Sequence, residues 1–195
     1  MDRAWINHAS KLQFINPEPL LKDLHTLDMR LGRSSLPRKV RTLRTNQLKR
    51  SREAREAALF CYGIGQRMGR PVYLAQDESQ DYDFVGRWID GSGGRHYAPV
   101  QLKEVVPADL NPAASIAAAI RSLTKYADSG ELTVAIHLNR AAQFNPDELH
   151  IPPLRIAALW VFASISADKS VWGLWGNLLE DRLGSIFKHP RHAAG

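Results

Sequence analysis

An acid, an amide and a lysine come together if residues 82–106 fold into a β-hairpin. Asp83 opens a stretch of alternating character, the turn sequence Asp90-Gly91-Ser92-Gly93-Gly94 follows it, and Gln101-Leu102-Lys103 lies in the next stretch. Side chains alternate between the two faces of a strand, so Gln101 and Lys103 share one face. A turn at Gly91 to Gly94 then places Asp83 opposite Gln101 to Lys103, within side-chain reach.

This set of side chains suits the metal-assisted cleavage of a phosphodiester bond. A carboxylate and a second oxygen donor, here Asp83 and Gln101, can hold a hard cation such as Mg²⁺ or Mn²⁺. The backbone carbonyl of Leu102 can complete the coordination shell. The Lys103 side chain can orient water or, as the neutral amine, deprotonate it, and as an ammonium group it can stabilise developing negative charge.

The elements that must position these residues are predicted from periodicity, caps and breakers. Ser51 is expected to cap a helix that Gly69 closes, with a small-residue stripe that packs on a sheet, made of Ala54, Ala57, Ala58 and Cys61. We then expect strands at 72–76, 82–89 and 97–106 as an antiparallel meander, a helix at 113–126 and a strand at 132–138. A helix at 152–166, a strand at 170–175 and a helix at 178–187 complete the prediction.

The predicted fold class is α/β, with a mixed sheet. Residues 1–50 are expected to form a basic N-terminal arm or helical cap, which includes a short helix near 19–31 ended by Gly32. Residues 51–195 are expected to form a single domain. Because apolar positions are sparse in 36–48, we expect that segment to become fully ordered only on a partner.

The helix, three strands, helix and strand at 51–138, together with Asp83 and Gln101-Leu102-Lys103, resemble the PD-(D/E)xK nuclease superfamily. That superfamily has the restriction-endonuclease-like fold, with an αβββαβ core. The resemblance implies a metal-dependent endonuclease in which Asp83, Gln101 and the Leu102 carbonyl hold Mg²⁺ or Mn²⁺. It also implies that Glu56, on the first core helix, assists the cation and that Lys103 lies at the attacking water. Glu78 and Asp81 are weaker auxiliary candidates.

The net charge of +6 is concentrated in one segment. Between residues 30 and 55, ten arginines and lysines stand against one acid, Glu53. Such a cluster favours phosphate groups and gains from the release of their counterions, so DNA is the expected partner. A solvated basic face is the alternative. The candidate phosphate-contacting residues are Arg38, Lys39, Arg41, Arg44, Lys49, Arg50, Arg52 and Arg87, the last of which is equally a salt-bridge partner for Asp83.

Several function classes receive little support. The longest apolar run, 156–165, is too short for a membrane span, and the start Met-Asp-Arg-Ala-Trp lacks the pattern of a secretion signal. With Cys61 as the only cysteine, we expect the cytoplasm or a similar reducing compartment. The scattered histidines show no metal-ligand spacing, and the glycine-rich turns lack the context of a phosphate-binding loop.

Two alternatives from other classes remain. Gln101 stands where the superfamily more commonly has glutamate, which favours a non-catalytic nucleic-acid-binding or regulatory protein that retains the fold. A third interpretation is an assembly protein, in which the tryptophan-rich C-terminal third forms a homodimer through Trp160, Trp172 and Trp175 while the arm contacts an acidic partner.

Overall fold

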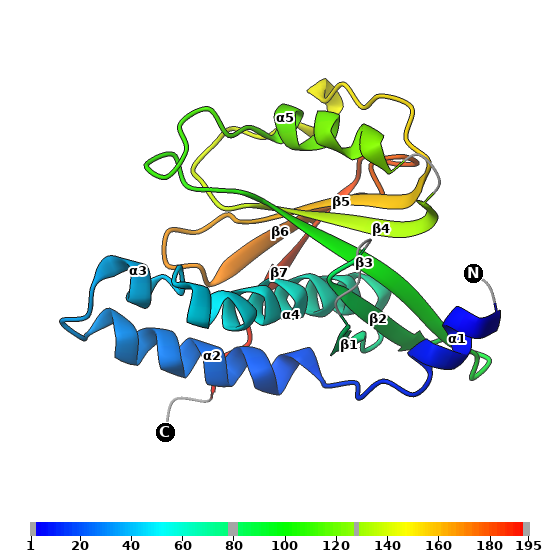
Figure 1. Cartoon of the computed structure of the whole chain (residues 1–195), viewed down its shortest axis with the longest axis horizontal. Coiled ribbons are helices and arrows are strands. Elements are labelled where there is room, and N and C mark those ends of the chain that lie inside the picture. Colours follow the sequence, from blue (N-terminus) through cyan, green and yellow to red (C-terminus); the bar gives the residue numbers. More distant parts are fainter. Residues whose placement is uncertain (1–2, 78–81, 127–128, 193–195) are drawn as a thin grey trace.

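The chain folds as an α/β protein around a seven-stranded mixed sheet, with helices on both faces (Figure 1). The computed structural model describes residues 3–77, 82–126 and 129–192. In Figure 1, α5 lies above the sheet, whereas α2 and α4 lie side by side below it. The spatial order of the strands, β1 to β7, is the same as their order in the sequence.

The helices are α1 (Arg3–Ala9), α2 (Pro17–Gly32), α3 (Arg38–Arg41), α4 (Lys49–Met68) and α5 (Ile116–Arg121), and the 3-10 turns are η1 (Asn46–Leu48), η2 (Ser122–Lys125) and η3 (Pro146–Glu148). The strands are β1 (Tyr73–Gln76), β2 (Phe84–Ile89), β3 (Arg95–Val105), β4 (Ser129–Leu138), β5 (Ile156–Ser164), β6 (Val171–Trp175) and β7 (Gly184–Lys188). Each helix in the described part of the chain is too short or too polar to cross a bilayer.

The predicted antiparallel meander of β1, β2 and β3 is confirmed, including its register. Phe84 pairs with Val100, and the next step of the ladder is a hydrogen bond of 2.9 Å from the Asp83 amide to the Val100 carbonyl. The turn is closed by Asp90, whose Oδ1 accepts hydrogen bonds from the backbone amides of Ser92 (2.8 Å) and Gly94 (2.9 Å). The hairpin therefore brings Asp83 level with Gln101.

β3 changes its neighbour part of the way along its length. Arg95 to Val100 pair with β2, whereas Val100 to Val105 pair with β4 in parallel. The crossover between these two parallel strands carries α5, which begins at the capping side chain of Ser115. The final residues of β3 thus extend beyond the start of β2. On the β2 side, the backbone of these residues faces Asp83.

The two faces of the sheet bury separate apolar clusters. On the α4 face, Ala57, Ala58 and Cys61 pack with β3 residues such as Leu102, which confirms these members of the predicted small-residue stripe; Ala54 is only partly buried. On the opposite face, Ile120 of α5 packs with Val105 and with residues of β4 and β5. Successive side chains of β3 therefore face α4 and α5 alternately.

α4 starts earlier than predicted and ends as predicted. It begins at Lys49 with no side-chain cap, so the expected N-cap at Ser51 is wrong; η1 leads directly into the first turn. Gly69 closes the helix in the left-handed conformation, with φ of 64°.

The N-terminal region contributes to the same core as the sheet. Leu21 of α2 is completely buried in the α4-face cluster, so this core extends across the boundary predicted at residue 50. The segment 36–48, expected to become fully ordered only on a partner, forms α3 and η1 in the isolated chain. Leu43, which is also completely buried, fixes this segment to the rest of the molecule.

Two predicted helices in the C-terminal third are wrong. The apolar run predicted as a helix at 152–166 is β5, a strand buried on both faces: Leu159 and Val161 face the α5 side, and Phe162 faces the α4 side. Double-sided burial removes the alternation that normally identifies a strand. Residues predicted as a helix at 178–187 form a single turn anchored by Asn177, followed by β7. The strand predicted at 170–175 is confirmed as β6.

We predict that the same glycine-to-alanine change will destabilise the protein at one position and will not destabilise it at another. A Cβ at Gly65 of α4 would lie 3.0 Å from the Arg70 carbonyl oxygen and 3.3 Å from the Val72 amide nitrogen, whereas a Cβ at Gly32 meets nothing within 4 Å. Gly65→Ala should lower the free energy of unfolding by about 1–3 kcal/mol through overpacking against backbone. Gly32→Ala should leave it unchanged or raise it by up to about 1 kcal/mol. Urea unfolding measures both, and a Gly65→Ala variant as stable as the wild type would contradict the close packing of α4 against the connection that leads to β1.

Candidate functional site

Asp83, Gln101 and Leu102 meet at the uncovered edge of β3. Oδ2 of Asp83 accepts a hydrogen bond from the backbone amide of Leu102 (2.7 Å) and another from Nε2 of Gln101. Nε2 of Gln101 also donates a hydrogen bond of 3.2 Å to the carbonyl oxygen of Leu102. One carboxylate oxygen and one carbonyl oxygen are therefore directed at the end of the Gln101 side chain, as the hairpin predicts.

This arrangement fits a hard cation after one small change. A half turn of the Gln101 amide exchanges its oxygen and nitrogen. Oε1 would then join the oxygens of Asp83 and Leu102 around a single point, which is favourable when a cation lies between them. The hydroxyl of Tyr126, which donates to Oε1 at 3.3 Å, can accept from the amide instead. Asp83, Gln101 and Leu102 are the residues that would hold such an ion.

Lys103 lies on the same face of β3 as Gln101. Its Nζ is 5.7 Å from the centroid of the Tyr126 ring, and Nζ of Lys125 in η2 is 5.0 Å from the same ring. Lys103 belongs to the strand and stands two positions from Gln101, whereas Lys125 comes from the helical layer. A cationic group therefore lies on the α5 face of β3, two positions along the strand from Gln101.

Glu56 is not brought to these residues. It lies on α4, which covers the opposite face of the sheet, and its Oε1 is 3.3 Å from Nδ1 of His137 on β4. Glu104, the residue after Lys103, points toward the same place, and one ligand atom each from Glu56, Glu104 and His137 lie within 4.8 Å of one another. The side chains of Glu56 and His137 are 7% and 9% exposed.

Glu104 is held as a carboxylate by its neighbours. Burial alone would raise the pKa of Glu104, but the hydrogen bonds donated by Arg44 and Asn139 and the charge of Arg44 outweigh burial and lower that pKa. Asn139 Nδ2 lies 2.7 Å from Oε1, and Arg44 contacts both carboxylate oxygens. This pair links the basic segment before α4 to the end of β3.

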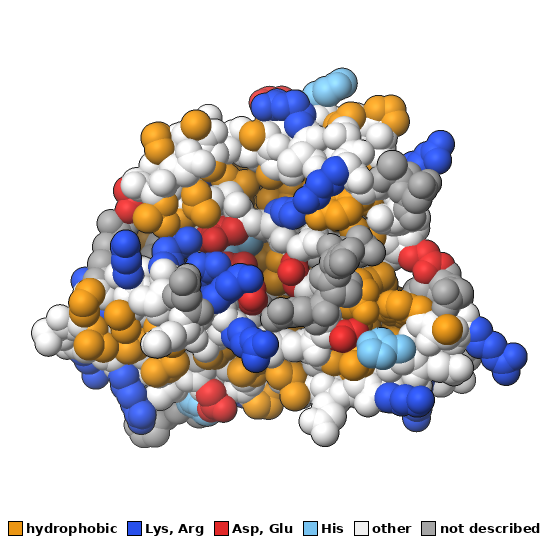
Figure 2. All heavy atoms as spheres, viewed as in Figure 1, with side chains coloured by type: hydrophobic (Ala, Val, Ile, Leu, Met, Phe, Trp, Pro, Cys, Tyr) orange, Lys and Arg blue, Asp and Glu red, His pale blue; other side chains and the backbone are white. Residues whose placement is uncertain are grey.

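A cavity of about 470 Å³ lies beside Glu56 and His137. It is bounded by α2, by the segment around Arg44, by α4 and by the ends of β4 and β7. Figure 2 shows Lys and Arg side chains next to Asp and Glu side chains over α3 and the first turns of α4. Cationic and anionic groups thus alternate in this region.

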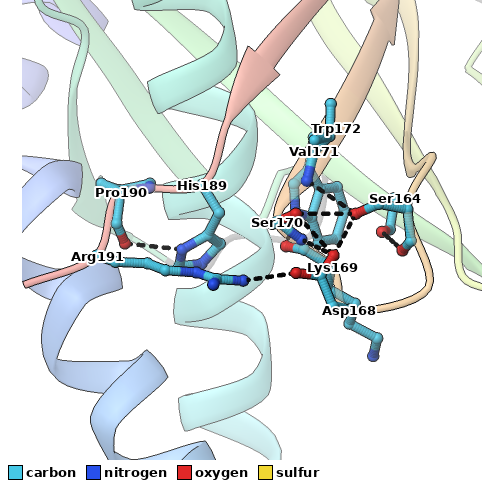
Figure 3. Close-up of polar contacts among 10 residues, drawn as sticks. Ser164, Asp168, Lys169, Ser170, Val171, Trp172, His189, Pro190 and Arg191 are labelled. Carbon is cyan, nitrogen blue, oxygen red and sulfur yellow. Dashed lines mark hydrogen bonds and ion pairs between the residues drawn. The ribbon is translucent and has the colours of Figure 1, made fainter. Parts of the chain in front are cut away.

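The far wall of the cavity is the turn between β5 and β6 (Figure 3). Asp168 Oδ1 accepts hydrogen bonds from the hydroxyls of Ser166 (2.8 Å) and Ser170 (2.6 Å), which lower the pKa of Asp168. Arg191 reaches from the chain after β7 and donates to Asp168 Oδ2 at 3.2 Å. His189, which also lines the cavity, lies with its ring centroid 5.5 Å from that of His25 on α2.

Some of the predicted phosphate-contacting residues are exposed, and others are engaged inside the protein. Lys39, Arg41, Lys49 and Arg50 are exposed. Arg44 is engaged with Glu104, and Arg52 lines the cavity. Arg38 begins α3, but its side chain lies outside the described part of the structure, as do Glu78 and Asp81. The exposed group is the one that remains accessible to a polyanion.

Arg87 packs against aromatic rings. Its guanidinium carbon is 4.5 Å from the centroid of the Phe14 ring and 4.9 Å from that of Tyr73. These distances are typical of cation–π contacts, which stabilise the N-terminal segment on the meander. In the structure Arg87 serves packing.

No family model, curated protein or solved structure matches this chain.

Sequence reasoning missed the contribution of Glu104 and His137. The alternation that puts Gln101 and Lys103 on one face of β3 necessarily puts Glu104 on the other, where α4 lies. His137 is the one polar residue in the apolar stretch Val134–Leu138. A buried polar residue in an otherwise apolar strand was the available signal.

We predict that Arg44→Ala will destabilise the fold strongly. The change leaves the Glu104 carboxylate buried without its cation, which should lower the free energy of unfolding by about 3 kcal/mol. Lys22→Ala is the control, because Lys22 and Glu18 form an i, i+4 pair with side chains 29% and 46% exposed, which should contribute less than about 0.5 kcal/mol. Urea unfolding followed by circular dichroism measures both, and equal effects would show that the Arg44–Glu104 pair contributes no more than a surface pair.

We also predict that acid will weaken the fold through His189. Burial of the ring, reinforced by the charges of His25, Arg191 and Arg55, lowers the pKa of His189. The unfolded chain therefore binds a proton more readily, and stability should fall as the pH decreases through the ordinary histidine range near 6.5. His189→Gln should lose less stability than the wild type between about pH 7.5 and pH 5.5. His150→Gln, at an exposed position, should retain the wild-type pH dependence.

Proposed function

We propose that this chain is a metal-dependent endonuclease that hydrolyses phosphodiester bonds of DNA through Asp83, Gln101 and Lys103. The observation that carries the proposal is the meeting of the Asp83 carboxylate, the Gln101 amide and the Leu102 backbone at the edge of β3. The order α4, β1, β2, β3, α5, β4 supports it, because this is the order of the restriction-endonuclease-like core.

Each residue has a role in this proposal. Asp83, Gln101 and the Leu102 carbonyl would hold Mg²⁺ or Mn²⁺, which would supply a Lewis acid for the phosphate and lower the pKa of a bound water. Lys103 would orient that water for attack. As the water oxygen bonds to phosphorus and the bond from phosphorus to the ester oxygen breaks, Lys103 would also stabilise the negative charge that develops. Glu56 is left out of this site, since it pairs with His137 on the opposite face of the sheet.

DNA remains the proposed partner because the exposed basic residues lie in one segment. Lys39, Arg41, Lys49 and Arg50 fall between α3 and the first turn of α4. Such contacts provide affinity without sequence preference. A homodimer and a cytoplasmic setting stay predictions, the latter from the single cysteine, Cys61, which is buried.

A non-catalytic nucleic-acid-binding protein is the second candidate. It is favoured by the hydrogen bond from the Gln101 amide to Asp83, because this bond satisfies the carboxylate without a cation. In that case the chain would retain salt-sensitive binding to DNA and lack cleavage.

We predict that purified protein will nick supercoiled plasmid in Mg²⁺ or Mn²⁺ and that Asp83→Asn and Lys103→Ala will each reduce the rate at least about 100-fold. Lys125→Ala is the matched control for Lys103→Ala, since both lysines lie beside the Tyr126 ring but Lys125 is outside the strand motif. It should retain at least half of the wild-type rate. Plasmid gels and single-stranded substrates, with chelator as a blank, provide the measurement.

Three outcomes are informative. Cleavage that depends on metal, Asp83 and Lys103 supports the nuclease. Salt-sensitive gel retardation with no cleavage in any metal supports the non-catalytic binder. Cleavage that survives both substitutions in variants with wild-type melting curves rules out this site.

A further inference from the structure

Glu56, Glu104 and His137 form a second polar site, on the opposite face of the sheet from Asp83. They come from α4, β3 and β4, three elements packed against one another. One nitrogen and two oxygen ligand atoms lie within 4.8 Å of one another among these side chains. Glu56 and His137 are both more than nine-tenths buried, with 5% and 7% of the residue exposed.

The contact between Glu56 and His137 has the spacing of two ligands on one ion. Nδ1 of His137 lies 3.3 Å from Oε1 of Glu56. Two ligands bound tetrahedrally at the usual zinc distances stand about 3.3 Å apart. The ligand atoms of all three residues lie within 4.8 Å of one another, a limit wider than this spacing. Rotation of the Glu104 side chain can bring its carboxylate to the ligand distance.

The His137 nitrogen has no hydrogen bond despite its burial. Nδ1 faces Glu56 at 3.3 Å, but the geometry is not that of a hydrogen bond, and the atom has no other hydrogen-bonding partner among the described residues. Buried imidazole nitrogens are normally satisfied, so an unsatisfied one in a cluster of carboxylates indicates a missing ligand. The His137 ring is held by Phe162, against which it stacks at 4.9 Å with the planes 9° apart.

Glu104 already has the outer contacts that a metal-binding carboxylate needs. Asn139 donates to its Oε1 at 2.7 Å, whereas Oε2 takes the longer contact of 3.4 Å with Arg44. Hydrogen bonds of this kind orient ligands around a metal. The cavity beside Glu56 and His137 gives an ion a route in and leaves room for a water molecule as a further ligand.

We propose that Glu56, Glu104 and His137 bind one divalent transition-metal ion of the Zn²⁺ class, at a site separate from the proposed magnesium site. An imidazole donor with two carboxylates favours Zn²⁺, Co²⁺ or Mn²⁺ over Mg²⁺, which takes oxygen ligands and keeps its waters. The ion offsets the negative charge of the two glutamates beyond what Arg44 supplies. It also ties α4 to the centre of the sheet.

The test uses tag-free, chelator-treated full-length protein. Equilibrium dialysis should show one equivalent of Zn²⁺ bound, and titration with Co²⁺ should produce the visible absorption of a site with a nitrogen ligand. In the Asp83→Asn variant, which lacks a ligand of the proposed magnesium site, Zn²⁺ should raise the melting temperature, and Mg²⁺ at the same concentration should not. His137→Gln and Glu56→Gln should each weaken Zn²⁺ binding at least about 10-fold, while Glu53→Gln, one turn earlier on α4, should bind as the wild type does.

Asp83→Asn separates this site from the proposed nuclease site, because it should retain the Co²⁺ absorption whether or not the wild type cleaves DNA. Wild-type protein that takes up no Zn²⁺ overturns the proposal, and that result does not depend on whether any variant folds. So does Co²⁺ absorption that disappears in Asp83→Asn and persists in His137→Gln.

Discussion

The change of neighbours along β3 is the constraint on which both polar sites depend. β2 covers β3 only as far as Val100, and beyond that point the amide and carbonyl of Leu102 are directed past the start of β2. A backbone group in a partly buried strand needs a partner. The Asp83 carboxylate is the partner of the Leu102 amide. The need to satisfy this backbone amide therefore fixes the position of the acid. Because side chains alternate along β3, Gln101 and Lys103 lie on one face of the sheet and Glu104 lies on the other.

The sequence allowed the hairpin and its register to be predicted because the turn residues and the alternation agree. Asp83 meets Gln101 for that reason. The strand β5 escaped prediction, since Leu159 and Phe162 are buried on opposite faces and its pattern is that of any buried apolar segment. The meeting of Glu56 with Glu104 and His137 depends on how α4 is placed on the sheet. That placement is set by packing at positions such as Gly63, which meets the Phe187 ring of β7, and has no local signature.

The basic segment was predicted as a surface for polyanions, and much of its charge is used inside the protein. Arg44 neutralises Glu104, and Arg55 pairs with Asp28 of α2. These pairs fasten α2, α4 and β3 together around the cavity. Net charge counted along the sequence therefore overstates the charge offered to a partner. Burial of Leu43 adds an apolar anchor at the same place, so the segment is part of the fold.

Because the strands lie in the sheet in the order in which they occur in the chain, each new strand docks beside the one just made. The antiparallel units β1–β3 and β5–β7 close only short loops, at little entropic cost, and each is a local unit of structure. β4, parallel to both of its neighbours, joins the two units and requires the longer closures. The kinetics of folding should therefore be governed by the arrival of a single central strand, which is also the strand that carries His137.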